Sequence, residues 1–325
     1  MQLSTAMVWR RQKFLQGLIC LAFAFPQTPL AAETSYVDIG QLAARCEAKL
    51  KYSDEGDCAK IDAGKFEIQC RLNSALYKIG GTNVYGQWPV AGQRGSLRIA
   101  REDWERVIVP LLSPFPAQQL RRICIDPGHG GKDCGARTQR TNLEEKQLTL
   151  DVAKRLQKLL QKRGIDAILT RTSDCYIPLE NRPAVANRSK CDMFVCIHFN
   201  AADSPNAEGM ETYIVPHQGA ASTARLQSPS TGDKKFCINN RHNERNLCLA
   251  HCIQRELSSL KSSKDRGVKR GRFTVLENAN CPAVLVECGF MTGLQESRRI
   301  GNWDHRQAIA AALCDGICSY GAGRK

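Results

Sequence analysis

The stretch Ile123-Cys124-Ile125-Asp126-Pro127-Gly128-His129-Gly130-Gly131 joins a short apolar run to a glycine-rich turn that carries a histidine. The run at 123–126 predicts a strand, and the glycines after it predict a sharp turn with free space beside His129. Apolar residues then recur at helical spacing from Leu148 to Leu159. A strand, a turn and a helix in this order are typical of an α/β domain.

The same alternation continues through residues 122–320, which we expect to form one domain. Apolar runs predict the strands, and apolar residues three and four apart predict the helices. This order favours an α/β fold with a mostly parallel sheet flanked by helices. The further strands are expected at 167–170, 193–198, 209–215 and 283–287, and the further helices at 246–260 and 306–318.

Residues 33–112 have a different pattern, in which short mixed segments are separated by glycines. They predict a small α+β domain that precedes the larger one. Residues 113–121 begin with Ser-Pro-Phe-Pro and predict a linker. The small domain contains no histidine, so we expect it to contribute to binding or localisation and not to chemistry.

The first 32 residues have the features of a secretory signal peptide. Three basic residues precede an apolar run at 14–25, and the small pair Ala31-Ala32 follows. The run is about half of the ~20 residues that a membrane span needs, which makes a short membrane anchor the less favoured alternative. We therefore expect an exported protein, periplasmic or associated with the cell wall, with no stable membrane span after the signal is removed.

The composition indicates a globular protein with a strong positive charge. Of its 325 residues, 42% are hydrophobic and 24% are charged, and the formal net charge is +14. Removal of residues 1–32, which include three basic residues and no acidic one, leaves +11. Such a charge suits any polyanion, including nucleic acid, cell walls and anionic membranes. Export argues against nucleic acid as the partner.

The sixteen cysteines do not indicate a disulfide scaffold or a zinc finger. Their fraction is below the ~8–10% of disulfide-rich chains, and no CxxC motif occurs. Cys124, Cys196 and Cys288 lie inside apolar runs, where we expect them to be small core residues. Disulfide connectivity cannot be deduced from sequence.

Four polar residues stand where the predicted elements would bring them together. His129 and His198 each follow an apolar strand, and sites in open α/β sheets form outside the carboxyl ends of strands. Glu145 begins a helix and shares its inward face with Leu148 and Val152. Two histidines and one glutamate, with a fourth position open, are a catalytic zinc arrangement. Glu287 ends the run 283–286 and is a candidate general base for the attacking water.

The chain resembles the zinc-dependent N-acetylmuramoyl-L-alanine amidases of the third amidase family. The matching stretches are IDPGHGGKDCGA at 125–136, EEK at 144–146, ILTRTSD at 168–174, LENRPAVAN at 179–187, CDMFVCIHFNA at 191–201, DRGVK at 265–269 and PAVLVECGFMTGLQE at 282–296.

The resemblance implies that His129, Glu145 and His198 bind Zn²⁺ and that Glu287 is the catalytic glutamate. The implied reaction is hydrolysis of the amide bond between N-acetylmuramic acid and the L-alanine of the stem peptide, with peptidoglycan as the partner. Asp126 and Asn200 are plausible groups for orienting the metal ligands.

Two features depart from the family pattern. Cys134 stands where the family has a proline; a thiolate can bind zinc, but we favour a packing role. Residues 218–245 form a polar insertion that predicts a loop. Some relatives carry an inhibitory helix over the site, so the need for a protein activator stays open. The sequence around the other four histidines does not indicate that they bind a metal; these are His217, His242, His251 and His305.

Two other functions are compatible with parts of the sequence. The ligand set alone also suits another zinc peptidase of the cell wall, one that cuts within the stem peptide. A non-catalytic peptidoglycan-binding protein with a vestigial metal site is the second alternative. The presence of all four key residues argues against the latter, and the surrounding motifs favour the amidase.

Overall fold

The structure, a computed structural model, describes residues 34–64, 66–138, 142–225, 231–260 and 264–324. The expected signal peptide lies outside these residues. The chain divides into two compact units between Phe115 and Pro116, within the segment expected to be a linker. Among the described residues, no helix is both long and apolar enough to cross a membrane.

The first unit is a small α+β unit built on antiparallel strands. Strands β2 to β6 pair in sequence order, and β1, β8 and β7 form a separate three-stranded sheet. Alternate residues of β3 and β4 are buried, because one face of the sheet covers the core. The elements are β1 (Tyr36–Asp38), α2 (Ile39–Arg45), β2 (Lys49–Tyr52), β3 (Cys58–Asp62), β4 (Glu67–Arg71), β5 (Leu76–Ile79), β6 (Thr82–Tyr85), β7 (Ala91–Gln93), β8 (Ser96–Ala100), α3 (Arg101–Asp103), a π-helical turn (Trp104–Ile108) and α4 (Val109–Leu112).

The second unit contains a mostly parallel sheet, as the sequence predicts. Its strands follow the order β10-β9-β11-β14-β12-β13, and every neighbouring pair is parallel except β14–β12. The elements are β9 (Arg122–Pro127), α5 (Glu145–Lys162), β10 (Asp166–Leu169), α6 (Asn181–Arg188), β11 (Met193–Asn200), β12 (Met210–Ile214), α7 (Asn243–Ser258), β13 (Asp265–Arg270), α8 (Thr274–Glu277), β14 (Ala283–Phe290), α9 (Leu294–Gly301) and α10 (Trp303–Gly321).

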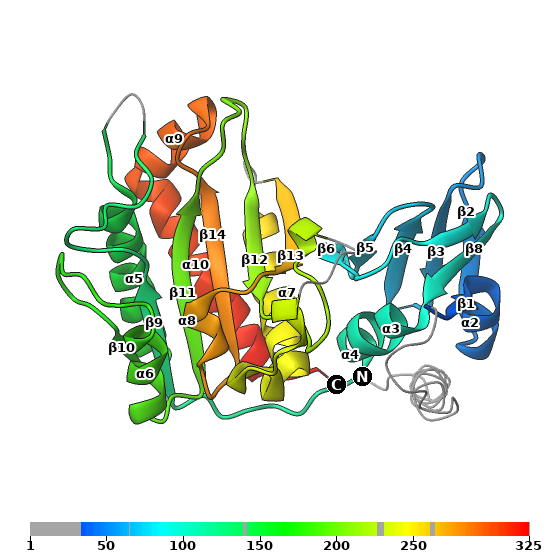
Figure 1. The fold of residues 1–325 in the computed structure, drawn as a ribbon, viewed down its shortest axis with the longest axis horizontal. Helices are drawn as coiled ribbons and strands as arrows, with labels where there is room; N and C mark the ends of the chain where they lie inside the picture. The colour runs from blue at the N-terminus through cyan, green and yellow to red at the C-terminus, as the bar shows by residue number, and fades with distance from the viewer. Residues whose placement is uncertain (1–33, 65, 139–141, 226–230, 261–263, 325) are drawn as a thin grey trace, which may run out of the picture. The chain divides into compact units, whose positions relative to one another are not determined.

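Helices cover both faces of this sheet (Figure 1). Helix α10 packs against both α5 and α7 on one face, while α6 and α8 contact each other on the opposite face. The central strands β9, β11 and β14 are therefore buried on both sides and are almost continuously apolar. Cys124, Cys196 and Cys288 are fully buried in these strands, so the prediction that they belong to the core is confirmed.

Several elements were absent from the sequence-based prediction or began elsewhere. The strand β13 was missed because its sequence, DRGVKR, is mostly charged. Helices α6 and α9 were missed because eight residues are too few for a clear apolar stripe. Helix α7 begins at Asn243, inside the segment that we expected to be a loop.

The parallel strands β9, β11 and β14 end at the same edge of the sheet, where the antiparallel strand β12 begins. The four polar residues singled out from the sequence all belong to this edge or to the helix that begins beside it.

Candidate metal centre

The turn after β9 brings the first histidine into position. His129 adopts a left-handed backbone conformation with φ of 61°, which is uncommon for a residue with a side chain. A β-carbon on Gly128 would lie 2.3 Å from Cε1 of His198, so the imidazole of His198 occupies the space that this glycine leaves open. The glycine therefore allows the two histidines to approach each other.

His129, Glu145 and His198, the three predicted ligands, converge on one point. Oε1 of Glu145 lies 3.0 Å from Nε2 of His129 and 3.0 Å from Nδ1 of His198. The two imidazole rings meet edge to face, with centroids 4.7 Å apart. The nearest ligand atoms of all three residues lie within 4.8 Å of one another. This is the only such cluster of three or more histidine, cysteine or acidic side chains among the described residues.

Glu145, the first residue of α5, is held by backbone amides as well as by the histidines. The N–H of Phe199 donates to Oε1 at 3.0 Å, and the N–H of Ala136 donates to Oε2 at 2.9 Å. Burial raises the pKa of this carboxyl, but hydrogen bonds from His129 and His198 outweigh burial and hold it well below its ordinary value. The side chain is therefore a carboxylate, the form that binds a metal.

Asp133 fixes the orientation of His129. Its Oδ2 lies 2.9 Å from Nδ1 of the imidazole. In a neutral imidazole whose Nδ1 donates its proton to Asp133, Nε2 has a free lone pair and can bind a metal instead of donating to Glu145. Burial lowers the pKa of His129, yet the bonds to Glu145 and Asp133 raise it overall. Sequence reasoning missed Asp133, although it lies four residues after His129 in the stretch 125–136.

Two buried arginines support the turn at 127–129, and neither was predicted. Arg182 of α6 donates to the carbonyls of Pro127 at 3.0 Å and His129 at 2.9 Å. Arg171 donates to the carbonyls of Pro127 at 3.0 Å and Gly128 at 2.8 Å. Arg171 lies in the stretch 168–174 and Arg182 in the stretch 179–187, both of which match the family. That match is the one feature of the sequence that could have pointed to these two arginines.

Asp126 and Asn200 do not have the role that we expected, because neither contacts a predicted ligand through a hydrogen bond. Asp126 is fully buried and forms an ion pair with Arg182 at 3.1 Å. Asn200 donates through Nδ2 to Glu211 at 2.8 Å. Asp126 also accepts hydrogen bonds from the hydroxyl of Thr170 and from Sγ of Cys196. Its partner Arg182 in turn holds the backbone carbonyl of His129.

Glu287 lies beside the cluster but is not part of it. It is the register partner of His198 in β11 and of Glu211 in β12. Its Oε2 is buried and has no hydrogen-bond partner among the described residues. Burial raises the pKa of Glu287 well above its ordinary value, and the charges of Glu145 and Glu211 raise it further. Such a carboxyl is suited to accepting and holding a proton.

The donor set fits a divalent transition metal. Two imidazole nitrogens and one carboxylate oxygen converge, which is the protein donor set of a catalytic zinc site. Oε2 of Glu287 is buried and has no hydrogen-bond partner among the described residues, so a polar or charged group bound beside it would satisfy it. Cys134 is not in the cluster; its Sγ donates to the carbonyl of Gly135 at 3.3 Å.

The described part of the insertion at 218–245 is anchored away from this edge. It contains three short 3₁₀ turns, and Asn239 donates to the carbonyls of Ala279 at 3.0 Å and Cys281 at 2.9 Å. Those carbonyls precede β14, whereas Glu287 lies towards its other end. The described residues of the insertion thus attach to the edge opposite the cluster.

Comparison with known proteins gives the family. The model of the family described as N-acetylmuramoyl-L-alanine amidase matches residues 123–319, more than half of the chain. The chain belongs to the N-acetylmuramoyl-L-alanine amidase family. The family and the α/β fold predicted from the sequence are thereby confirmed. Residues 34–115 lie outside the amidase match.

Curated relatives carry the same name. The amidase AmiA of Salmonella typhimurium is 32% identical over 220 residues, which cover 62% of this chain and 76% of the relative. The amidase LytC of Bacillus subtilis is 33% identical over 217 residues, which cover 65% of this chain but 39% of the relative. The shared part is therefore the amidase domain.

Solved amidase structures have the same fold. AmiC2 of Nostoc punctiforme is 30% identical with a TM-score of 0.51, over 62% of this chain and 98% of that structure. An amidase from Clostridium difficile 630 is 33% identical with a TM-score of 0.51, over 62% of this chain and 97% of that structure. Nearly all of each of these solved chains is thus matched by a part of this chain.

Proposed function

We propose that this protein is a zinc-dependent N-acetylmuramoyl-L-alanine amidase that separates stem peptides from the glycan strands of peptidoglycan. It would hydrolyse the amide bond between the lactyl group of N-acetylmuramic acid and L-alanine. Family membership supports the reaction. The observation that carries the mechanism is the convergence of His129, Glu145 and His198, with Glu287 in register beside His198.

In this proposal His129, Glu145 and His198 hold the zinc ion. When bound, zinc polarises the carbonyl of the scissile amide and lowers the pKa of water to near 7. Asp133 keeps Nε2 of His129 available, and Arg171 and Arg182 keep the turn in place. These groups position the ligands before substrate arrives, which reduces the rearrangement needed during reaction.

Glu287 has the proton-transfer role. Its carboxylate accepts the proton of the attacking water and then gives it to the leaving nitrogen of L-alanine. Burial and the charges of Glu145 and Glu211 raise the pKa of Glu287 above its ordinary value, which makes its carboxylate a stronger proton acceptor than an ordinary glutamate. No hydrogen bond to a described residue occupies Oε2 and competes for that proton.

Export and regulation are parts of the same proposal. Residues 1–32 would direct the chain to the periplasm or cell wall, where its substrate lies. A protein partner is a reasonable regulator, because the related CwlD amidase of Clostridioides difficile, 27% identical with a TM-score of 0.51, was solved in complex with the lipoprotein GerS.

The test is digestion of purified peptidoglycan followed by mass spectrometry of the new ends. Release of intact stem peptides with free L-alanine amino groups is the expected result. New ends inside the stem peptide would instead identify a zinc peptidase. Binding without any release would identify a non-catalytic peptidoglycan-binding protein.

A further inference from the structure

The sheet of the first unit carries a row of cationic and amide side chains across its strands. The register of four successive strand pairs places them directly opposite one another, so neighbours in the row are about 4.7–4.9 Å apart along the hydrogen-bonding direction. We call this set the lysine row. It consists of Lys51, Lys60, Gln69, Lys78 and Asn83, one from each of β2 to β6.

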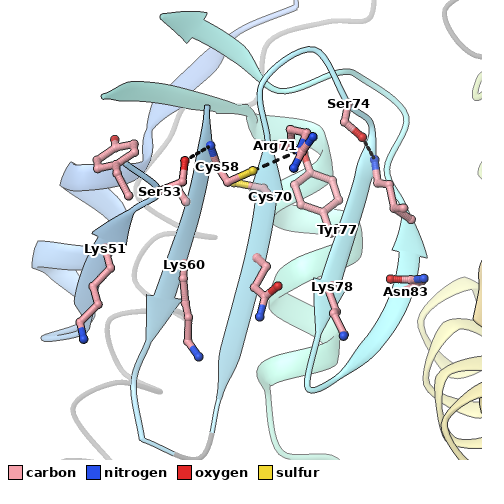
Figure 2. A pocket seen from close by; sticks show the side chains of 14 residues that line it. Lys51, Ser53, Cys58, Lys60, Cys70, Arg71, Ser74, Tyr77, Lys78 and Asn83 are labelled. Atoms are coloured by element: carbon pink, nitrogen blue, oxygen red, sulfur yellow. Dashed lines mark hydrogen bonds between the residues drawn. The ribbon is translucent and has the colours of Figure 1, made fainter. Parts of the chain in front are cut away.

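The lysine row faces outward because its neighbours along each strand fill the core. Ile61, Ile68 and Ile79 point to the opposite face and are buried. Lys51 and Lys78 are exposed. Figure 2 shows Lys51, Lys60, Lys78 and Asn83 projecting from β2, β3, β5 and β6 on the same side of the sheet. Together with neighbouring side chains they line a hollow of about 560 Å³.

The charge of this face is only partly neutralised. Lys60 forms an ion pair with Glu67, and Gln69 donates to the same carboxylate at 2.5 Å. Lys51 and Lys78 form no ion pair with any described residue. Arg71, beside the row, has a side chain that is 67% exposed and lies 3.8 Å from Asp57. The face therefore keeps unpaired positive charge in a linear arrangement.

We propose that the lysine row binds peptidoglycan through its carboxylates and so holds the enzyme on its substrate. The inference rests on the proposed function, which makes peptidoglycan the polyanion that the chain meets. Stem peptides carry carboxylates, and each stem that the amidase removes leaves a lactyl carboxylate on the glycan. A row that carries three lysines along one hollow is complementary to such an extended anionic polymer.

The experiment uses the full chain and the double variant Lys51→Glu/Lys78→Glu. Binding to purified sacculi, measured by sedimentation at low salt, should weaken by about tenfold or more, because two attractions become two repulsions. Binding of the wild type should also weaken as salt rises. Hydrolysis of a soluble muramoyl peptide should be unchanged, because neither lysine belongs to the metal centre.

The matched control is Lys154→Glu/Lys158→Glu on the exposed side of α5. It changes the net charge of the chain equally and should leave binding to sacculi nearly intact. Lys51→Gln/Lys78→Gln should give an intermediate loss of binding. Unchanged melting temperatures would confirm that all variants are folded.

A second arm identifies the chemistry of the ligand. Sacculi whose carboxylates have been amidated should bind the wild type as weakly as untreated sacculi bind the glutamate variant. Equal binding to amidated sacculi, dependence on phosphate polymers of the wall, or equal loss in the α5 control would each overturn the proposal. A wild type that fails to hydrolyse the soluble muramoyl peptide would refute the proposed function instead, since the binding arms do not depend on turnover.

Discussion

Gly128 has no side chain, yet its position determines whether His198 can reach the metal centre. A methyl group in its place would lie 2.3 Å from the imidazole, too close for the ring to stay. We predict that Gly128→Ala lowers zinc affinity by about ten- to a hundredfold, the usual effect of disturbing a group that orients a ligand. Titration with a competing chelator measures this, and His198→Ala provides the reference for losing the ligand itself.

Gly301→Ala is the control for that prediction. The nearest side-chain atom would lie 3.6 Å from the new methyl group, an ordinary contact distance. This variant should bind zinc like the wild type. If Gly128→Ala also retains wild-type affinity, the two imidazoles do not need their observed approach, and the three-ligand site is wrong.

Glu287 is the residue whose role in catalysis is most directly testable. We predict that Glu287→Gln folds and retains zinc but loses about two or more orders of magnitude in turnover, the usual contribution of a positioned acid–base group. Zinc content and turnover should be measured on the same preparation. A zinc-loaded variant with near-normal turnover would make Glu287 a structural carboxylate at a strand end.

The raised pKa of Glu287 also predicts how the metal-free protein responds to pH. Because the folded state retains a proton that the unfolded chain releases above its ordinary pKa of 4.5, stability falls as pH rises towards the folded pKa. Relative to the wild type, metal-free Glu287→Gln should therefore gain about 1–3 kcal/mol in free energy of unfolding by about pH 8. At about pH 4 the gain should be close to zero.

Urea denaturation in the presence of a chelator tests this difference. His129, whose pKa is raised, adds a pH-dependent contribution of the same sign, lost as pH rises above its ordinary value of 6.5. Subtracting the wild-type curve from the variant curve removes the part that both proteins share. A difference that does not grow with pH would contradict the proposed environment of Glu287.

At the scale of elements, α6 supports a turn that it does not belong to. Arg182 and Asp126 are both buried, and breaking such a pair leaves an unpaired charge in the core. We predict that Arg182→Ala lowers the free energy of unfolding by about 3–5 kcal/mol. Arg188→Ala, exposed on the same helix, should change it by less than about 0.5 kcal/mol. A loss below about 1 kcal/mol for Arg182→Ala would show that the turn does not need this helix.

The helices and strands that could be predicted from the sequence are those whose buried residues form a regular pattern of apolar side chains along the chain. Strands β9, β11 and β14 are buried on both faces, and α5 carries a long apolar stripe, so each has a clear signal. Strand β13 is mostly charged because Arg266 and Lys269 bind Glu211 in β12. That partner comes from a distant part of the chain, and no local pattern reveals it.

The site as a whole was predictable to a similar extent. The residues proposed as ligands could be grouped because the carboxyl ends of parallel strands meet at one edge. Asp133, Arg171 and Arg182 could not be assigned, because their roles depend on the path of the backbone after β9. Such roles follow from three-dimensional contacts between loops and not from the type of residue.

At the scale of the whole molecule, the division at Phe115/Pro116 separates chemistry from the lysine row. Every residue placed in the metal centre lies after Pro116, and the amidase match begins at residue 123. The backbone N–H of Gln118 donates to the carbonyl of Gly321 at 2.8 Å, so the start of the second unit is attached to the end of α10. The second unit thus has its own core, and its first and last segments are joined by this hydrogen bond.

We therefore predict that a chain beginning at Pro116 folds, binds one zinc ion and hydrolyses soluble muramoyl peptides at a rate within about threefold of the full chain, since turnover depends on local geometry within the metal centre. On intact sacculi it should be slower, because the lysine row is gone. Far-ultraviolet circular dichroism, metal analysis and turnover on both substrates test this together. A truncated chain that is folded and zinc-loaded but inactive on the soluble substrate would make the first unit part of the catalytic machinery, against the division of roles argued here.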